Sequence, residues 1–162
     1  MTVEEQGEVE VAEESRYVID RDWFEARGLS FDDVVLERIC DQCRGRLGET
    51  VEERYTAFDK KSGRMSFDLR KVPYGQNPVK VIRECCGKKK GYITPDMPTL
   101  EAIFRIYLAN GNQPMPLEHV RDQLAEWCPG GGCQWLMLPM ETLVRLVEHD
   151  GHYGLRRHDV AS

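Results

Sequence analysis

The stretch Arg38-Ile-Cys-Asp-Gln-Cys43 carries two cysteines at a Cys-x2-Cys spacing, and a second pair, Cys85-Cys86, follows further along the chain. Two thiolates at this spacing can turn inward onto one metal ion, and a tetrahedral site needs four such ligands. The two pairs therefore predict a metal centre with Cys40, Cys43, Cys85 and Cys86 as its ligands. The expected metal is zinc, with an iron–sulfur cluster as the alternative.

Adjacent cysteines complicate the second half of this site. Successive side chains on a strand point to opposite faces, so Cys85 and Cys86 can face one metal only if the chain turns locally, which Gly87 permits. Otherwise the fourth ligand comes from elsewhere, and the alternative ligands are Cys128 and Cys133, or His149 and His152. The segment between Cys128 and Cys133 has three interpretations: it completes the metal site, it forms a redox-sensitive disulfide, or it is a flexible turn.

Charge divides the chain into three segments. The 162 residues carry a formal net charge of −6. Residues 1–15 hold six glutamates and no lysine or arginine, so we expect an acidic, disordered tail there. Residues 16–96 carry 17 basic and 14 acidic side chains, a net charge of +3, whereas residues 97–162 carry a net charge of −3. We place a domain boundary between these two segments, in the Pro-containing linker at residues 94–98.

Short helices and a hairpin are expected before the boundary. N-capping residues followed by apolar side chains predict helices at residues 21–27 and 31–39. Aromatic, β-compatible segments at residues 54–58 and 65–69, joined by a turn sequence, predict a β-hairpin. A third short strand is expected at residues 79–82, leading into the second cysteine pair.

Three helices are expected after the boundary, because apolar residues recur at helical spacing. They fall at residues 100–108, 117–127 and 140–148, and a strand is expected at residues 152–157. In this order, and with a short linking strand at residues 111–116, residues 99–158 resemble a winged helix-turn-helix. The segment at 140–148 takes the position of the recognition helix in that resemblance.

The Cys-rich segment at residues 16–96 is similar to a zinc ribbon, in which cysteine pairs follow strands. Together the two resemblances imply an α+β fold, with a small zinc-ribbon-like β module and N-terminal helices followed by a winged helix-turn-helix domain. The winged helix itself implies a surface that binds either nucleic acid or a protein partner.

Basic residues suggest a nucleic-acid interface. They are concentrated in the Cys-rich module, with one arginine on the expected recognition helix: Lys80, Arg83, Lys88, Lys89, Lys90 and Arg145. Basic groups near aromatic rings suit phosphate contact and base stacking. We therefore expect a metal-stabilised nucleic-acid-binding protein, a transcription-related regulator whose partner is DNA or a nucleic-acid-processing assembly. The alternatives are a protein–protein adaptor with structural zinc, and an iron–sulfur or thiol redox sensor.

Three sequence motifs that identify common classes of enzyme are absent from this chain. A glycine-rich phosphate loop, a nucleophile elbow and a zinc-protease helix are all missing. We therefore expect no catalytic residues and no enzymatic activity. The acidic N-terminus and the lack of a long apolar run predict a cytoplasmic protein with no membrane partner.

Overall fold

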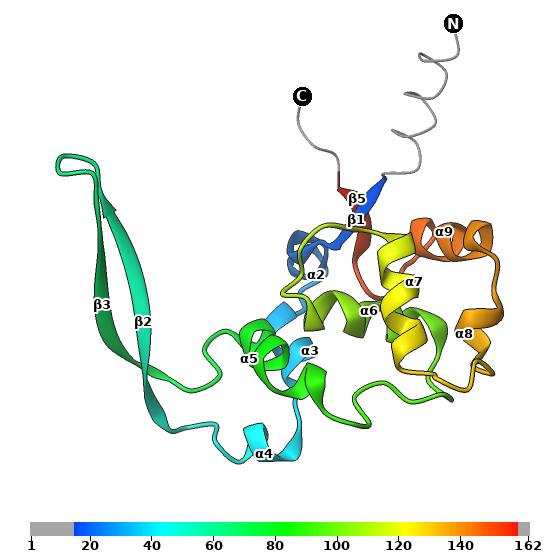
Figure 1. The fold of residues 1–162 in the computed structure, drawn as a ribbon, viewed down its shortest axis with the longest axis horizontal. Helices are drawn as coiled ribbons and strands as arrows, with labels where there is room; N and C mark the ends of the chain where they lie inside the picture. The colour runs from blue at the N-terminus through cyan, green and yellow to red at the C-terminus, as the bar shows by residue number, and fades with distance from the viewer. Residues whose placement is uncertain (1–14, 159–162) are drawn as a thin grey trace, which may run out of the picture.

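A computed structural model of the protein describes residues 15–158 (Figure 1). The acidic tail expected at residues 1–15 lies outside the described residues, apart from Ser15. The fold is α+β, as expected, with two small antiparallel sheets. No helix within residues 15–158 is long and apolar enough to cross a bilayer.

The first sheet joins the two ends of the described chain. β1 (Arg16–Ile19) lies between β4 (Met115–Pro116) and β5 (Leu155–His158) and is antiparallel to both. Residues on either side of the expected domain boundary therefore share one sheet. The division of the chain into domains at residues 94–98 stays a prediction. The winged helix also stays a prediction, because β5 pairs with β1, near the start of the described chain, rather than with a second wing strand that follows it.

Helices lie beside this sheet and below it in the view of Figure 1. They are α2 (Arg21–Ala26), α3 (Phe31–Leu36), α4 (Asp41–Arg44), α5 (Pro78–Glu84), the 3-10 helix η1 (Cys86–Lys88), α6 (Thr99–Ala109), α7 (Leu117–Glu126), α8 (Gln134–Met137) and α9 (Met140–Glu148). The expected N-caps are confirmed, because the side chains of Asp20 and Ser30 accept hydrogen bonds from the first turns of α2 and α3.

A single hydrophobic core packs around α6, which is buried on most of its sides. Ile103, Phe104 and Leu108 of this helix are fully buried, as is Trp135 of α8. Side chains from both sides of the expected boundary enter this core, from Tyr17 to Leu155. The described chain therefore depends on one continuous core.

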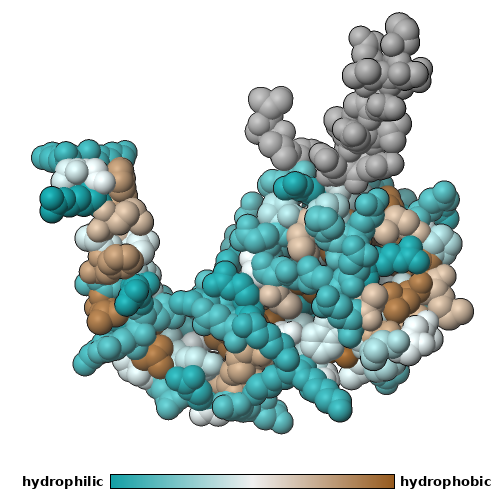
Figure 2. Space-filling view, viewed as in Figure 1, coloured by the Kyte–Doolittle hydropathy of each residue, from teal (hydrophilic) through white to brown (hydrophobic). Residues whose placement is uncertain are grey.

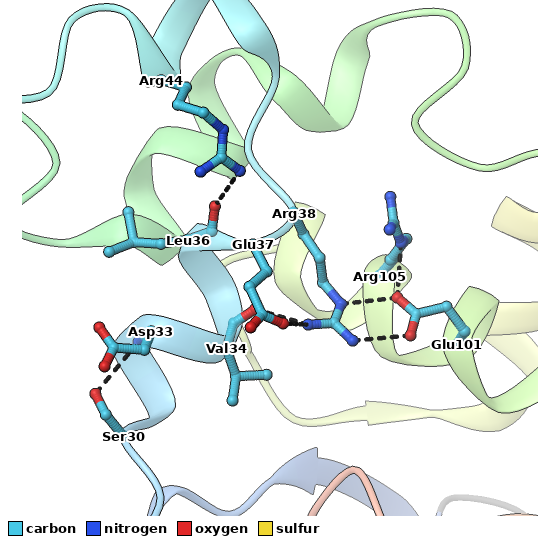
Figure 3. Close-up of polar contacts among 9 residues, drawn as sticks. All are labelled: Ser30, Asp33, Val34, Leu36, Glu37, Arg38, Arg44, Glu101 and Arg105. Carbon is cyan, nitrogen blue, oxygen red and sulfur yellow. Dashed lines mark hydrogen bonds and ion pairs between the residues drawn. The ribbon is translucent and has the colours of Figure 1, made fainter.

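An ion-pair cluster links α6 to the turn after α3 (Figure 3). Arg38 donates hydrogen bonds of 2.7 and 2.8 Å to the two carboxylate oxygens of Glu101, and Arg105 Nε donates one of 2.8 Å. The Glu101 side chain is only 14% exposed. Burial raises the pKa of Glu101, but the hydrogen bonds and charges of the two arginines lower it to about 2.

The second sheet is a long hairpin of β2 (Thr50–Asp59) and β3 (Arg64–Pro73), which projects from the body (Figure 1). The predicted hairpin is confirmed, but each strand is longer than the aromatic segment that predicted it. The extension pairs Glu52 with Lys71 and Glu53 with Arg70. Such cross-strand pairs of opposite charge stabilise the pairing of two strands. They leave no apolar pattern in the sequence from which the longer strands could be predicted.

The strand predicted at residues 79–82 is wrong, because this segment lies in helix α5. Pro78 occupies the first turn of the helix, where its missing N–H has no cost. Val79, Val81 and Ile82 are all buried in the helix. Burial of these three side chains against the core overrides the strand preference of β-branched residues. The second cysteine pair thus follows a helix, and the zinc-ribbon arrangement is not confirmed.

Candidate metal centre and groove

Four cysteines from two distant segments meet in one cluster. Cys40 precedes α4 and Cys43 lies within it, while Cys85 ends α5 and Cys86 begins η1. Their Sγ atoms all lie within 4.8 Å of one another, so the group can hold a metal ion. In a tetrahedral zinc–thiolate site, bonds of about 2.3 Å place the sulfurs about 3.8 Å apart. The cluster is therefore close to the size of such a site.

The chain turns at Cys85, and this turn lets two adjacent cysteines face the same centre. Cys85 has φ −134° and ψ −72°, which separates α5 from η1. Gly87, which we expected to permit the turn, has a different role. A Cβ at this position would lie 2.8 Å from Cβ of Ala109 on α6, so glycine is needed for close packing.

The thiols of the cluster differ in how readily they lose a proton. Lys89 Nζ donates a hydrogen bond of 3.1 Å to Cys40 Sγ and one of 2.6 Å to Gln42 Oε1. Burial raises the pKa of the Cys40 thiol, but hydrogen bonds from the Cys43 backbone and from Lys89 lower it to about 6. Burial instead raises the pKa of Cys86 to about 12. One thiolate forms readily, and a bound cation would be needed to stabilise the others.

Cys128 and Cys133 are not part of this cluster. They form a disulfide with each other, with Cα atoms 6.3 Å apart, in the loop between α7 and α8. Of the three interpretations of this segment, the structure has the disulfide. The four cysteines of the two other pairs are free.

The basic residues expected to bind nucleic acid lie in three places rather than on one surface. Lys80 and Arg83 are on α5, Lys88, Lys89 and Lys90 are at or just after η1, and Arg145 is on α9. Some of them already have partners: Lys80 lies 3.6 Å from Glu53, and Lys89 contacts Cys40. The α9 helix lies on the opposite side of the body from the hairpin (Figure 1).

A groove of about 390 Å³ lies between the foot of the hairpin and α5. Its lining contains three basic and three acidic side chains, together with Tyr74, Asn77 and Cys85: Arg46, Arg54, Lys80, Glu52, Glu53 and Glu84. The Arg46 guanidinium stacks 4.1 Å from the centre of the Tyr74 ring. Burial and a hydrogen bond with Cys43 raise the pKa of Tyr74 to about 12. The groove therefore adjoins the cysteine cluster directly.

This groove was not predicted from the sequence. Arg46, Tyr74 and Asn77 lie in loops around the hairpin, and no local motif marks them. The one sequence feature that could have indicated the groove is the loop at residues 74–78. Its sequence, Tyr-Gly-Gln-Asn-Pro, combines a turn with polar side chains and comes shortly before the second cysteine pair.

One comparison with known proteins bears on the activity. Over 102 residues the chain is 30% identical to a Bacillus subtilis (strain 168) protein, provisionally named ADP-ribose pyrophosphatase YjhB. This match covers 62% of the chain and 43% of the relative, so the chain spans less than half of the relative's length. No family model and no solved structure matches the chain.

This relative overturns two expectations. Its name denotes an enzyme, which contradicts the expected nucleic-acid-binding regulator and the expected lack of enzymatic activity. Each motif that we searched for is a dense local pattern, such as a phosphate loop or a nucleophile elbow. The absence of these few patterns does not exclude an enzyme of another class.

Proposed function

We propose that this chain acts in the hydrolysis of a nucleotide diphosphate bond, with ADP-ribose as the first substrate to test. The observation that carries the proposal is the groove beside the hairpin, where Arg46, Arg54 and Lys80 line the walls. Guanidinium and ammonium groups are the side chains that bind phosphate oxygens. The partial likeness to a protein named for ADP-ribose supports the same chemistry.

The groove has the size to hold a diphosphate, and its basic side chains can be released from their present partners to bind one. Its volume of about 390 Å³ lies within the range of small-molecule sites. Arg46 pairs at 3.1 Å with Glu49, and both side chains are about half exposed. Lys80 lies 3.6 Å from Glu53. Because the exposed Arg46–Glu49 pair contributes little free energy, a diphosphate can displace Glu49 from Arg46 at low cost.

Carboxylates in the same groove suit a divalent cation. Glu53 and Glu84 both line it and offer the oxygen ligands that Mg²⁺ prefers. Mg²⁺ is usually held by one or two carboxylates together with substrate phosphates, so a preformed cluster of three carboxylates is not required. When bound, such a cation supplies charge neutralisation at the reacting phosphoryl group. The part of Arg46 and Lys80 is then to hold the non-bridging oxygens in place.

We further propose that the four cysteines hold zinc in a structural role. Four thiolates complete the coordination of zinc and leave no open position for a substrate. Cys85 lines the groove, and Cys43 contacts Tyr74, another residue of its wall. The metal therefore fixes the groove through α4 and α5. An iron–sulfur cluster is the alternative, and its visible colour would distinguish it from zinc.

The test is hydrolysis of ADP-ribose by the metal-loaded chain with Mg²⁺, followed by chromatographic measurement of AMP. Addition of one water across the P–O–P bond gives AMP and ribose 5-phosphate. We expect AMP release that depends on Mg²⁺. We expect Arg46→Ala and Lys80→Ala each to lower kcat/KM by about tenfold or more, because each removes a charged hydrogen bond to phosphate.

The matched control is Arg145→Ala, on α9 away from the groove. It removes the same type of charge and should leave kcat/KM within about twofold. The proposal fails if the chain neither binds ADP-ribose in calorimetry nor releases AMP. It also fails if the Arg46 and Arg145 variants behave alike.

A further inference from the structure

The outer part of the hairpin is a ribbon with one apolar face, and within the described residues only the Arg54 guanidinium lies over it, 5.2 Å from the centre of the Phe67 ring. In the observed register, Arg54 lies opposite Leu69, Thr56 opposite Phe67 and Phe58 opposite Met65. Directly opposed residues share a face, and alternate residues along a strand return to it. The apolar stripe, defined as Phe58, Met65, Phe67 and Leu69, therefore lies on one face of the ribbon.

The opposite face of the ribbon is polar. Its pairs are Glu53 with Arg70, Tyr55 with Asp68, Ala57 with Ser66 and Asp59 with Arg64. The ribbon is thus amphipathic, like a strand pair that packs one face against a core. Figure 2 shows apolar side chains along the projecting arm, separate from the main body.

The apolar stripe is exposed to an unusual extent. Its four side chains are 58–64% exposed, and every residue from Thr56 to Lys71 is exposed. Isolated two-stranded ribbons are at best marginally stable in water, and a third strand or a covering surface is normally needed. A ribbon of this length therefore calls for a partner on its apolar face.

We propose that the partner is a second copy of this chain, packed ribbon against ribbon through the apolar stripe. The area supports this occupant. Side chains of this size have areas on the order of 200 Å², so four that are three-fifths exposed offer roughly 480 Å² per copy. Two copies bury roughly 960 Å² through the stripe, the size of a weak, reversible interface.

The arrangement of residues also suits self-association. A two-fold interface must be complementary to itself, so its centre lies at the middle of the stripe. Phe67 occupies that position, between Met65 toward the tip and Leu69 toward the foot. In antiparallel stacking, Phe67 meets its own equivalent and Met65 meets Leu69 of the second copy.

The test measures the molar mass of the metal-loaded full chain by analytical ultracentrifugation from about 1 to 200 μM. We expect a monomer–dimer equilibrium with a dissociation constant on the order of micromolar, as for a small interface. Phe67→Lys places a charge at the centre of the stripe and should weaken dimerisation at least tenfold. Ser66→Lys is the matched control, because it adds the same charge to the same strand on the opposite face.

A second measurement does not depend on the stability of a charged variant. Phe67→Cys should form an intermolecular disulfide on mild oxidation, whereas Ser66→Cys should not, because only residue 67 lies near the two-fold axis. A wild type that is monomeric at 200 μM overturns the proposal, even if its hairpin binds lipid vesicles or another protein. Equal effects of the two lysine variants would also overturn it, because dimerisation would then use another surface.

Discussion

Lys89 lies beside the proposed metal centre, outside its set of four cysteine ligands. Its ammonium group lies 3.1 Å from Cys40 Sγ and also contacts Gln42. A zinc ion with four thiolates carries a net charge of −2, so a neighbouring cation and a hydrogen bond to sulfur both favour the loaded state. Protons compete with the metal for the thiolates, and Lys89 favours the metal in that competition.

We therefore expect Lys89→Met to weaken metal affinity at pH 7 by roughly tenfold, the lower end of the effect of outer partners at metal sites. Competition with a chromophoric chelator measures the affinity. Lys90→Met, one residue further along, is the control because it removes the same charge and leaves the hydrogen bond from Lys89 to Cys40 in place. Equal affinity of the Lys89 variant and the wild type would show that this hydrogen bond does not support the centre.

For individual residues, the sequence predicted that the four cysteines meet in one cluster but did not predict the groove. Cys40 and Cys43 lie close together in the chain, and their spacing alone indicates a shared metal. Arg46 and Tyr74, by contrast, become neighbours only because the hairpin returns the chain to its starting point. Pairwise spacing in a sequence carries no signal for such a contact.

Among the elements, α3 and α6 are joined by Glu101 and its two arginines (Figure 3). Because the pKa of Glu101 in the folded state is lowered from 4.5 to about 2, this interaction stabilises the fold above pH 4.5. Its contribution is lost as the pH falls from about 4.5 toward 2, where the carboxylate becomes protonated in the folded state.

We expect Glu101→Gln to lower the free energy of unfolding by about 1–3 kcal/mol at pH 7, because two partly buried arginines lose their charged partner. The difference from the wild type should narrow as the pH falls below 4.5. Urea unfolding at several pH values measures both effects. Glu37→Gln is the control, since the Glu37 side chain is 77% exposed and lies 3.9 Å from Arg38. A pH-independent difference would show that the charge of Glu101 is not the cause.

Element prediction succeeded where the signal was local. Helices α2 and α3 begin at N-capping residues, and α6, α7 and α9 have a helical apolar spacing. It failed at α5, where four β-branched or apolar residues in a short segment are compatible with either a strand or a helix. Packing of Val79, Val81 and Ile82 against the core decided between the two.

For the whole molecule, the pairing of β1 with β5 was beyond prediction from the sequence. Arg16–Ile19 is a four-residue strand whose partner, Leu155–His158, lies at the other end of the described chain. Nothing in either segment specifies the other. The resulting sheet packs against one core, while the hairpin projects from it and the cysteine cluster adjoins the groove at the hairpin's foot.

The measurement that tests this account most directly is the metal content of the purified chain, determined by elemental mass spectrometry beside its melting temperature. We expect one zinc per chain. We also expect Cys43→Ser to lose the metal and to melt at least 10 °C lower, because structural zinc contributes directly to the free energy of folding. Cys128→Ser, outside the cluster, should keep its zinc. A Cys43→Ser protein with unchanged metal content and melting temperature would contradict the account.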